Sequence, residues 1–97
     1  PDKVAQAMVS GMNYTWCGQS CGSISRAFLH ADIHDAVLER VPALAAKYKP
    51  GIPTDPETTM GCLIDGAALA RVKSYIASAH EQGARLVYGG EQPSDPA

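Results

Sequence analysis

Several features that mark large classes of proteins are scarce or missing in this sequence. No apolar run approaches the roughly 20 residues that a membrane-spanning helix needs. The 8 lysine and arginine residues are nearly balanced by the 10 aspartate and glutamate residues, which leaves a formal net charge of −2. This balance gives no electrostatic reason to expect nucleic acid or an anionic membrane as a partner. There are no internal repeats.

Cysteine is rare as well. The 97 residues include 3 cysteines, and an odd number argues against a closed disulfide framework. Free thiols are typical of a reducing compartment, so the composition predicts a cytoplasmic protein. A chain of this length can bury one small core.

Two amphipathic stretches near the ends of the chain predict helices. The first covers about residues 3–13 and is expected to be capped by Asp2. The other runs from about Asp65 to Gln82, and Gly83 supplies its stop. The face expected to be buried in the first helix is formed by Val4, Met8 and Met12, with Ala5 and Val9 beside them. In the other helix it is formed by Leu69, Val72, Ile76 and Ala79.

A helix is also predicted between these two. Asp32 is its expected cap, and Asp35 is expected in its first turn, where a negative charge favours the helix dipole. Pro42 interrupts the pattern and predicts a bend near Leu38, because proline removes a backbone hydrogen bond. The apolar face comprises Ile33, Val37, Val41, Leu44 and Tyr48.

Strands are predicted between and after these helices. The residues from Ile24 to His30 are too continuously apolar for a one-sided sheet, which predicts a strand buried on both faces. Arg85 to Tyr88 predicts a second, short strand, and Tyr48 to Ile52 is a weaker candidate. The order of helix, strand, helix, loop, helix and strand is that of an α/β layer with mostly parallel strands.

The candidate functional element is the stretch Gly18-Gln19-Ser20-Cys21, between the first helix and the first predicted strand. A cysteine on a tight loop between packed elements is well placed to act as a nucleophile. The glycines at positions 18 and 22 allow close approach of the backbone to a ligand. The alternative is a structural thiol, because free cysteines are often buried and pack as small hydrophobes.

The run from Gly18 to Arg26 resembles the cysteine signature of the aldehyde dehydrogenase superfamily. Further blocks keep the order and spacing of that family, so the resemblance covers nearly the whole chain. These blocks are Ile33-His34-Asp35, Gly51-Ile52-Pro53-Thr54-Asp55-Pro56-Glu57-Thr58, Met60-Gly61-Cys62-Leu63-Ile64, and Glu81-Gln82-Gly83-Ala84-Arg85 with Gly89-Gly90. The resemblance implies that residues 1–97 are part of a three-layer, mostly parallel-sheet catalytic domain in a longer enzyme, without the nucleotide-binding domain.

The resemblance also implies a reaction, the NAD(P)-dependent oxidation of an aldehyde to a carboxylic acid. Cys21 would attack the aldehyde carbon, and the resulting thiohemiacetal would lose a hydride and become a thioester that water hydrolyses. The backbone N–H of Cys21 would donate to the oxyanion. The family's asparagine donor, its glutamate base and its nucleotide-binding motifs are not found in this sequence, so we expect the segment alone to be inactive.

Cofactor and partners follow from the same resemblance. NAD or NADP is the expected cofactor, and many relatives present a polar and a basic side chain from the third helix to the adenosine ribose. The matching positions are Ala68, which departs from that pattern, and Arg71, which fits it. The expected partners are an aldehyde substrate, the remainder of the dehydrogenase chain and further copies in a homo-oligomer.

Three residues beside Cys21 are expected to line the substrate pocket: Trp16, Gln19 and Ser20. Trp16 stands where relatives often have asparagine, and a tryptophan can wall a pocket for an apolar substrate. The alternative for Trp16 is a place in the core.

Two other interpretations of the cysteines remain. Cys17 and Cys21 are four positions apart, as are His30 and His34, which is compatible with a small zinc-binding module. The 8 residues between the two pairs are fewer than the roughly 12 of a zinc finger. Alternatively, Cys17 could act as a resolving thiol for Cys21 in a redox module. For Cys17 and Cys62 the simplest expectation is packing in the interior.

Overall fold

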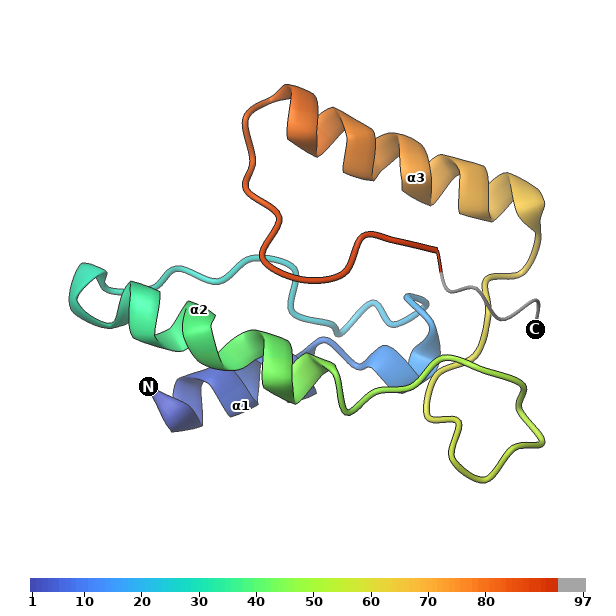
Figure 1. The fold of residues 1–97 in the computed structure, drawn as a ribbon, viewed down its shortest axis with the longest axis horizontal. Helices are drawn as coiled ribbons and strands as arrows, with labels where there is room; N and C mark the ends of the chain where they lie inside the picture. Colours follow the sequence, from blue (N-terminus) through green and yellow to red (C-terminus); the bar gives the residue numbers. More distant parts are fainter. Residues whose placement is uncertain (93–97) are drawn as a thin grey trace.

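The computed structural model describes residues 1–92 and is mostly helical (Figure 1). Its elements are α1 (Asp2–Gly11), the short 3-10 helix η1 (Tyr14–Trp16), α2 (Ala31–Ala45) and α3 (Gly66–Glu81). No strand is present among these residues, and one isolated parallel bridge joins Pro50 to Met60. None of the helices in this range is long and apolar enough to cross a membrane.

The core lies between α1 and α2, which run side by side (Figure 1). The apolar faces of both helices meet there, and Val37 is fully buried. The other buried residues are Ala5, Val9 and Ala45. Because two of these four are alanines, the helix backbones approach closely and little apolar volume is enclosed. At the rim, the Asp2 carboxylate accepts a hydrogen bond from the Arg40 guanidinium, which ties the start of α1 to α2.

The helices were predicted within a few residues, but two caps were predicted wrongly. Pro1, and not Asp2, precedes α1, so Asp2 lies inside the first turn. His30, and not Asp32, caps α2, and its Nδ1 accepts the backbone N–H of Asp32 at 3.1 Å. The predictions fail because α1 begins one residue earlier than expected and α2 begins two residues earlier. The earlier starts move each aspartate from the cap into the first turn, where the helix dipole favours it.

In α2 the helix runs through Pro42 without a break. Because proline has no N–H, the Leu38 carbonyl lacks its partner four residues later. The predicted apolar face is confirmed at Val37 and is half-buried at its other positions. Asp35 lies just beyond the first turn, which instead contains Asp32.

The third helix, α3, begins and ends as predicted but is not packed as predicted. Asp65 caps it by accepting the N–H of Ala68 at 2.7 Å. Gly83 follows its end with φ of 87°, a left-handed conformation that suits glycine. No residue of α3 is buried, and Val72 on its expected inner face is 41% exposed. The expected buried face is therefore wrong for the described residues, because no element covers it.

The three predicted strands do not form. Ile24 to His30 is an extended run (Figure 1), but its central residues form no backbone hydrogen bond among residues 1–92. Phe28, expected to be buried, is 93% exposed. Arg85 to Tyr88 is a loop, and Tyr48 to Ile52 contributes only the bridge at Pro50. A strand needs hydrogen bonds from a neighbouring chain segment, and the described residues supply none here.

The core assignment can be tested by chemical denaturation. Val37→Ala should lower the free energy of unfolding by about 2 kcal/mol, because it removes buried methyl groups and leaves a cavity. Val72→Ala is the matched control, and it should change the free energy by about 0.5 kcal/mol or less because Val72 lies on the exposed surface. Equal effects of the two substitutions would contradict a core centred between α1 and α2.

Candidate functional site

The loop that carries Cys21, residues 12–23, is closed at its base. The backbone N–H of Ile24 donates to the carbonyl of Gly11, the last residue of α1, at 2.9 Å. A Cβ atom at position 11 would crowd the side chain of Ile24, so a larger residue there would require that side chain to shift. The two ends of the loop therefore meet at the C-terminal end of α1.

Tight turns fold the first half of the loop. Asn13 and Cys17 adopt left-handed φ values of 57° and 58°, and they bracket η1. The N–H of Trp16 donates to the Asn13 carbonyl at 3.0 Å, and the N–H of Gln19 donates to the Trp16 carbonyl at 3.1 Å. These turns reverse the chain within a few residues and direct it towards Cys21.

Cys21 lies on a four-residue turn. The N–H of Ser23 donates to the Ser20 carbonyl at 3.3 Å, which places Cys21 and Gly22 at the centre of the turn. The Cys21 side chain is exposed and free of any disulfide. Its backbone N–H has no hydrogen-bond acceptor among residues 1–92. An accessible thiol beside an uncommitted N–H can attack a carbonyl carbon and hydrogen-bond the oxygen that becomes negative.

A hydrogen bond inside the loop connects its two halves. The Asn13 side-chain amide donates from Nδ2 to the Ser20 Oγ at 3.1 Å, and this contact is partly buried. Sequence reasoning identified Ser20 but missed Asn13. The signal that could have identified Asn13 is an asparagine shortly after the end of a helix, because asparagine adopts left-handed backbone more readily than most residues.

The other predicted pocket residues lie on the surface of the same loop. Trp16 is 60% exposed, so it is not a core residue, and its carbonyl accepts a hydrogen bond from the Gln19 amide at 3.4 Å. Arg71 is far along the sequence on α3, where its side chain is exposed. It forms no ion pair among the described residues.

The remaining two cysteines differ from each other. Cys17 is half-buried, and its Sγ lies 3.3 Å from the position that a Cβ on Gly61 would take, so it packs against the chain after α2 as expected. Cys62 is exposed, so the expectation that it packs in the interior is wrong. Its segment has no covering element in the described structure.

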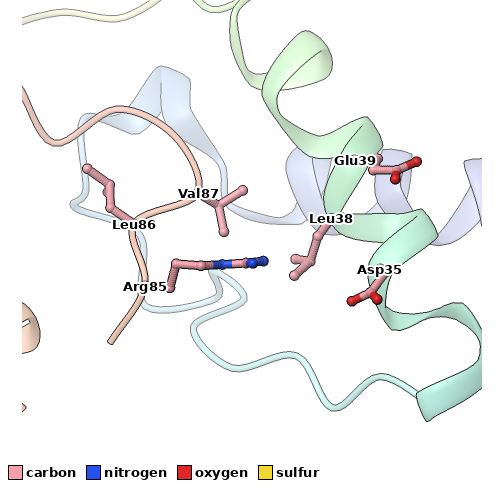
Figure 2. Close-up of a pocket in the computed structure, with 6 residues that line it drawn as sticks. All are labelled: Asp35, Leu38, Glu39, Arg85, Leu86 and Val87. Carbon is pink, nitrogen blue, oxygen red and sulfur yellow. The ribbon is translucent and has the colours of Figure 1, made fainter. Parts of the chain in front are cut away.

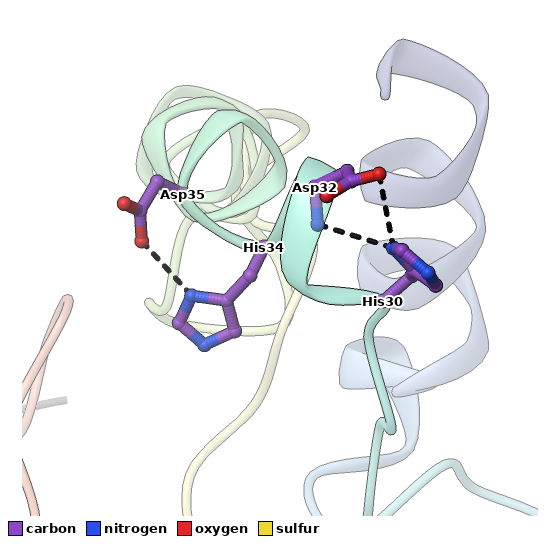
Figure 3. A network of polar contacts seen from close by, with 4 residues as sticks. All are labelled: His30, Asp32, His34 and Asp35. Carbon is purple, nitrogen blue, oxygen red and sulfur yellow. Dashed lines mark hydrogen bonds and ion pairs between the residues drawn. The ribbon is translucent and has the colours of Figure 1, made fainter.

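The zinc interpretation gains no support from the geometry. Among residues 1–92 no cluster of three or more histidine, cysteine, aspartate or glutamate side chains could hold a metal ion. His30 and His34 instead contact neighbouring carboxylates (Figure 3). The Nδ1 of His30 lies 3.7 Å from Asp32 Oδ2, and the Nδ1 of His34 lies 2.9 Å from Asp35 Oδ1. Both pairs are solvent-exposed and local to the start of α2.

A cavity of about 480 Å³ lies between α2 and the loop after α3 (Figure 2). Asp35, Leu38 and Glu39 line one wall, and Arg85 extends from the other towards α2. Leu86 and Val87 complete the lining. Cys21 does not reach this cavity, so the cavity and the cysteine loop are separate features.

An aromatic contact joins the cysteine loop to the segment after α2. The rings of Tyr14, in η1, and Tyr48, after α2, lie 5.0 Å apart at 52°. Burial raises the pKa of the Tyr14 phenol above its ordinary value of 10.0, and the nearby phenols of Tyr48 and Tyr88 raise it further. This contact links the loop to the segment after α2 and was not anticipated from the sequence.

A sequence profile of the aldehyde dehydrogenase family matches residues 1–97. The chain belongs to the aldehyde dehydrogenase family. This confirms the predicted family.

Individual relatives agree with the family assignment. The chain is 59% identical over 90 residues to the aldehyde dehydrogenase tropH of Talaromyces stipitatus, covering 92% of this chain and 18% of that protein. It resembles the solved structure of an indole-3-acetaldehyde dehydrogenase complexed with NAD+, with 38% identity and a TM-score of 0.82, over 93% of this chain and 18% of that one. An NAD+ complex of an aldehyde dehydrogenase from Bacillus cereus matches with 29% identity and a TM-score of 0.86, over 97% and 19% of the two chains.

The chain thus spans less than a fifth of the length of these relatives. The structural neighbours are α/β dehydrogenases, which agrees with the predicted fold class at that level. The predicted order of helices and strands within the segment is not reproduced, since residues 1–92 contain helices and no strand.

The support from Tyr14 can be tested through pH. Because the pKa of Tyr14 is raised in the folded state, its contribution to stability is complete below the ordinary pKa and is lost as the pH rises above about 10. The urea midpoint of the chain should therefore fall above that pH, and Tyr14→Phe should make the fall smaller. Tyr75→Phe is the control, since Tyr75 is 71% exposed. An identical pH dependence with and without Tyr14 would refute this role.

Proposed function

We propose that this chain supplies the nucleophile of an NAD(P)-dependent aldehyde dehydrogenase that oxidises an aldehyde to a carboxylic acid. The observation that carries the proposal is the placement of Cys21 at the centre of an exposed turn, with its backbone N–H uncommitted, in a chain of this family. Residues 1–97 would form part of the catalytic domain. The rest of the dehydrogenase chain would provide the remaining machinery.

In this proposal the Cys21 sulfur attacks the aldehyde carbon as a thiolate, forming a C–S bond while the carbonyl oxygen becomes an oxyanion. The Cys21 N–H donates a hydrogen bond to that oxyanion, where a fixed donor stabilises the developing charge most. A nicotinamide cofactor would supply the acceptor for the hydride that leaves the carbon bonded to the Cys21 sulfur. Water then cleaves the resulting thioester, which frees the carboxylic acid and regenerates the Cys21 thiol.

The surroundings of Cys21 suit an apolar aldehyde. Trp16 presents an exposed indole from the same loop, and Gln19 is held beside it by its hydrogen bond to the Trp16 carbonyl. An aromatic wall favours an apolar group next to the reacting carbonyl. Trp16, Gln19 and Ser20 are therefore the proposed pocket residues of this segment.

The fit to NAD or NADP is limited to one side chain of this chain. Arg71 is exposed on α3 and forms no ion pair among residues 1–92, so its guanidinium is available to a ribose hydroxyl or phosphate. The NAD+ complexes of the structural relatives support this class of cofactor. We propose a homo-oligomeric enzyme, and a cytoplasmic one because all three cysteines are free.

The nucleophile is tested by substitution in the full-length dehydrogenase that contains this segment. Cys21→Ser should lower aldehyde oxidation by about 10³-fold or more, because a hydroxyl is a far weaker nucleophile than a thiolate. Binding of NAD or NADP, measured by calorimetry, should stay nearly unchanged. Cys62→Ser is the matched control, since it removes another exposed thiol and should retain activity. Near-normal turnover of the Cys21→Ser enzyme would refute the assignment.

A further inference from the structure

No hydrogen bond of the Cys21 thiol to the described residues fixes the orientation of its side chain. The side chain is exposed, and it forms no hydrogen bond with any residue in the range 1–92. The direction of Sγ is therefore set by the backbone of the turn from Ser20 to Ser23. A single weak turn bond, from the Ser23 N–H to the Ser20 carbonyl at 3.3 Å, closes that turn.

The residue before Cys21 is held from outside the turn. Ser20 Oγ accepts the Asn13 amide at 3.1 Å, across seven positions of sequence. The same oxygen lies 3.9 Å from the position of a Cβ on Gly22, so the Ser20 side chain folds across the turn. Its hydrogen bond with Asn13 therefore restrains the residue that directly precedes Cys21.

Asn13 is itself firmly placed. Its backbone is left-handed, with φ of 57° and ψ of 48°, and its carbonyl accepts the Trp16 N–H at 3.0 Å. It lies two residues beyond the last residue of α1, and its own N–H donates to the Ser10 carbonyl at 3.3 Å. A donor fixed at the helix end thus restrains the turn that carries the nucleophile.

We propose that the hydrogen bond from Asn13 to Ser20 positions the Cys21 thiol for attack, with Asn13 and Ser20 acting as positioning residues. This inference rests on the proposed role of Cys21 as nucleophile. Attack on a carbonyl requires the sulfur to lie within about 3–3.5 Å of the carbon along a defined direction, and small misplacement lowers the rate strongly. Loss of the restraint should lower the rate of the chemical step and leave substrate binding nearly unchanged.

A double-mutant cycle in the full-length dehydrogenase tests this inference. Ser20→Ala removes the acceptor, and Asn13→Gly removes the donor while keeping a residue that tolerates left-handed backbone. Each single substitution should lower kcat for aldehyde oxidation by about tenfold, with KM changed by about twofold or less. The double variant should be no worse than either single one, because both remove the same hydrogen bond.

Two further variants control for unrelated damage. Ser20→Thr keeps the hydroxyl and should restore most of kcat. Ser23→Ala makes the same serine-to-alanine change in the same loop at a side chain that forms no hydrogen bond among the described residues, and it should leave kcat unchanged. Additive losses, or a change in KM with kcat intact, would overturn the positioning role and leave Ser20 only as a residue that lines the substrate pocket.

Alkylation separates this inference from the proposed function. The rate of iodoacetamide labelling at Cys21 needs no turnover, and it should rise by about two- to threefold in each single variant, because a freed thiol is reached from more directions. The same rise in the double variant would support the restraint even if Cys21→Ser left turnover intact. Unchanged labelling in both single variants would overturn it, whatever the fate of the nucleophile assignment.

Discussion

The packing of α1 against α2 is the constraint on which the rest of this structure depends. Its contact residues are small, so the two helix backbones lie close, and the Asp2–Arg40 ion pair joins the two helices at the exposed rim. This packing places Gly11 at the end of α1, and the Gly11 carbonyl in turn anchors the Ile24 N–H. The cysteine loop is therefore anchored to the best-packed part of the molecule. Such rigid support is expected for a loop that carries functional residues.

The apolar surface shows how much of the packing this chain leaves open. Phe28 is 93% exposed, Ile64 89% and Tyr75 71%. Large apolar side chains exposed along several segments indicate surfaces meant to be covered. The chain matches aldehyde dehydrogenases about five times its length, and the proposed remainder of such an enzyme would supply that cover. The absence of cover also explains why α3 has an amphipathic sequence and no buried residue.

Features that depend on local interactions could be predicted from the sequence, and features that depend on contacts between distant residues could not. The helices were found because their hydrogen bonds and caps are local, as at Asp65 and Gly83. The strand expected from Ile24 to His30 requires partners that are distant in sequence, and the described residues contain none. The apolar pattern of this run reflects the burial that a strand has in a complete sheet. The pattern therefore predicted a strand with hydrogen-bonded neighbours, whereas the structure has an extended segment.

The site divides in the same way. The position of Cys21 on an exposed loop was predictable from its glycines and from the signature around it. The Asn13–Ser20 hydrogen bond and the Tyr14–Tyr48 contact were not, because each joins residues that only the folded chain brings together.

Left-handed backbone at Cys17 costs roughly 1–2 kcal/mol. It persists here because the Cys17 N–H bonds the Tyr14 carbonyl at 3.0 Å and its sulfur packs at Gly61. Strain retained four residues before an exposed thiol is a common property of functional loops, where surrounding contacts hold a conformation that the chain alone would avoid. These contacts hold Cys17, while the separate hydrogen bond between Asn13 and Ser20 restrains the turn that carries Cys21.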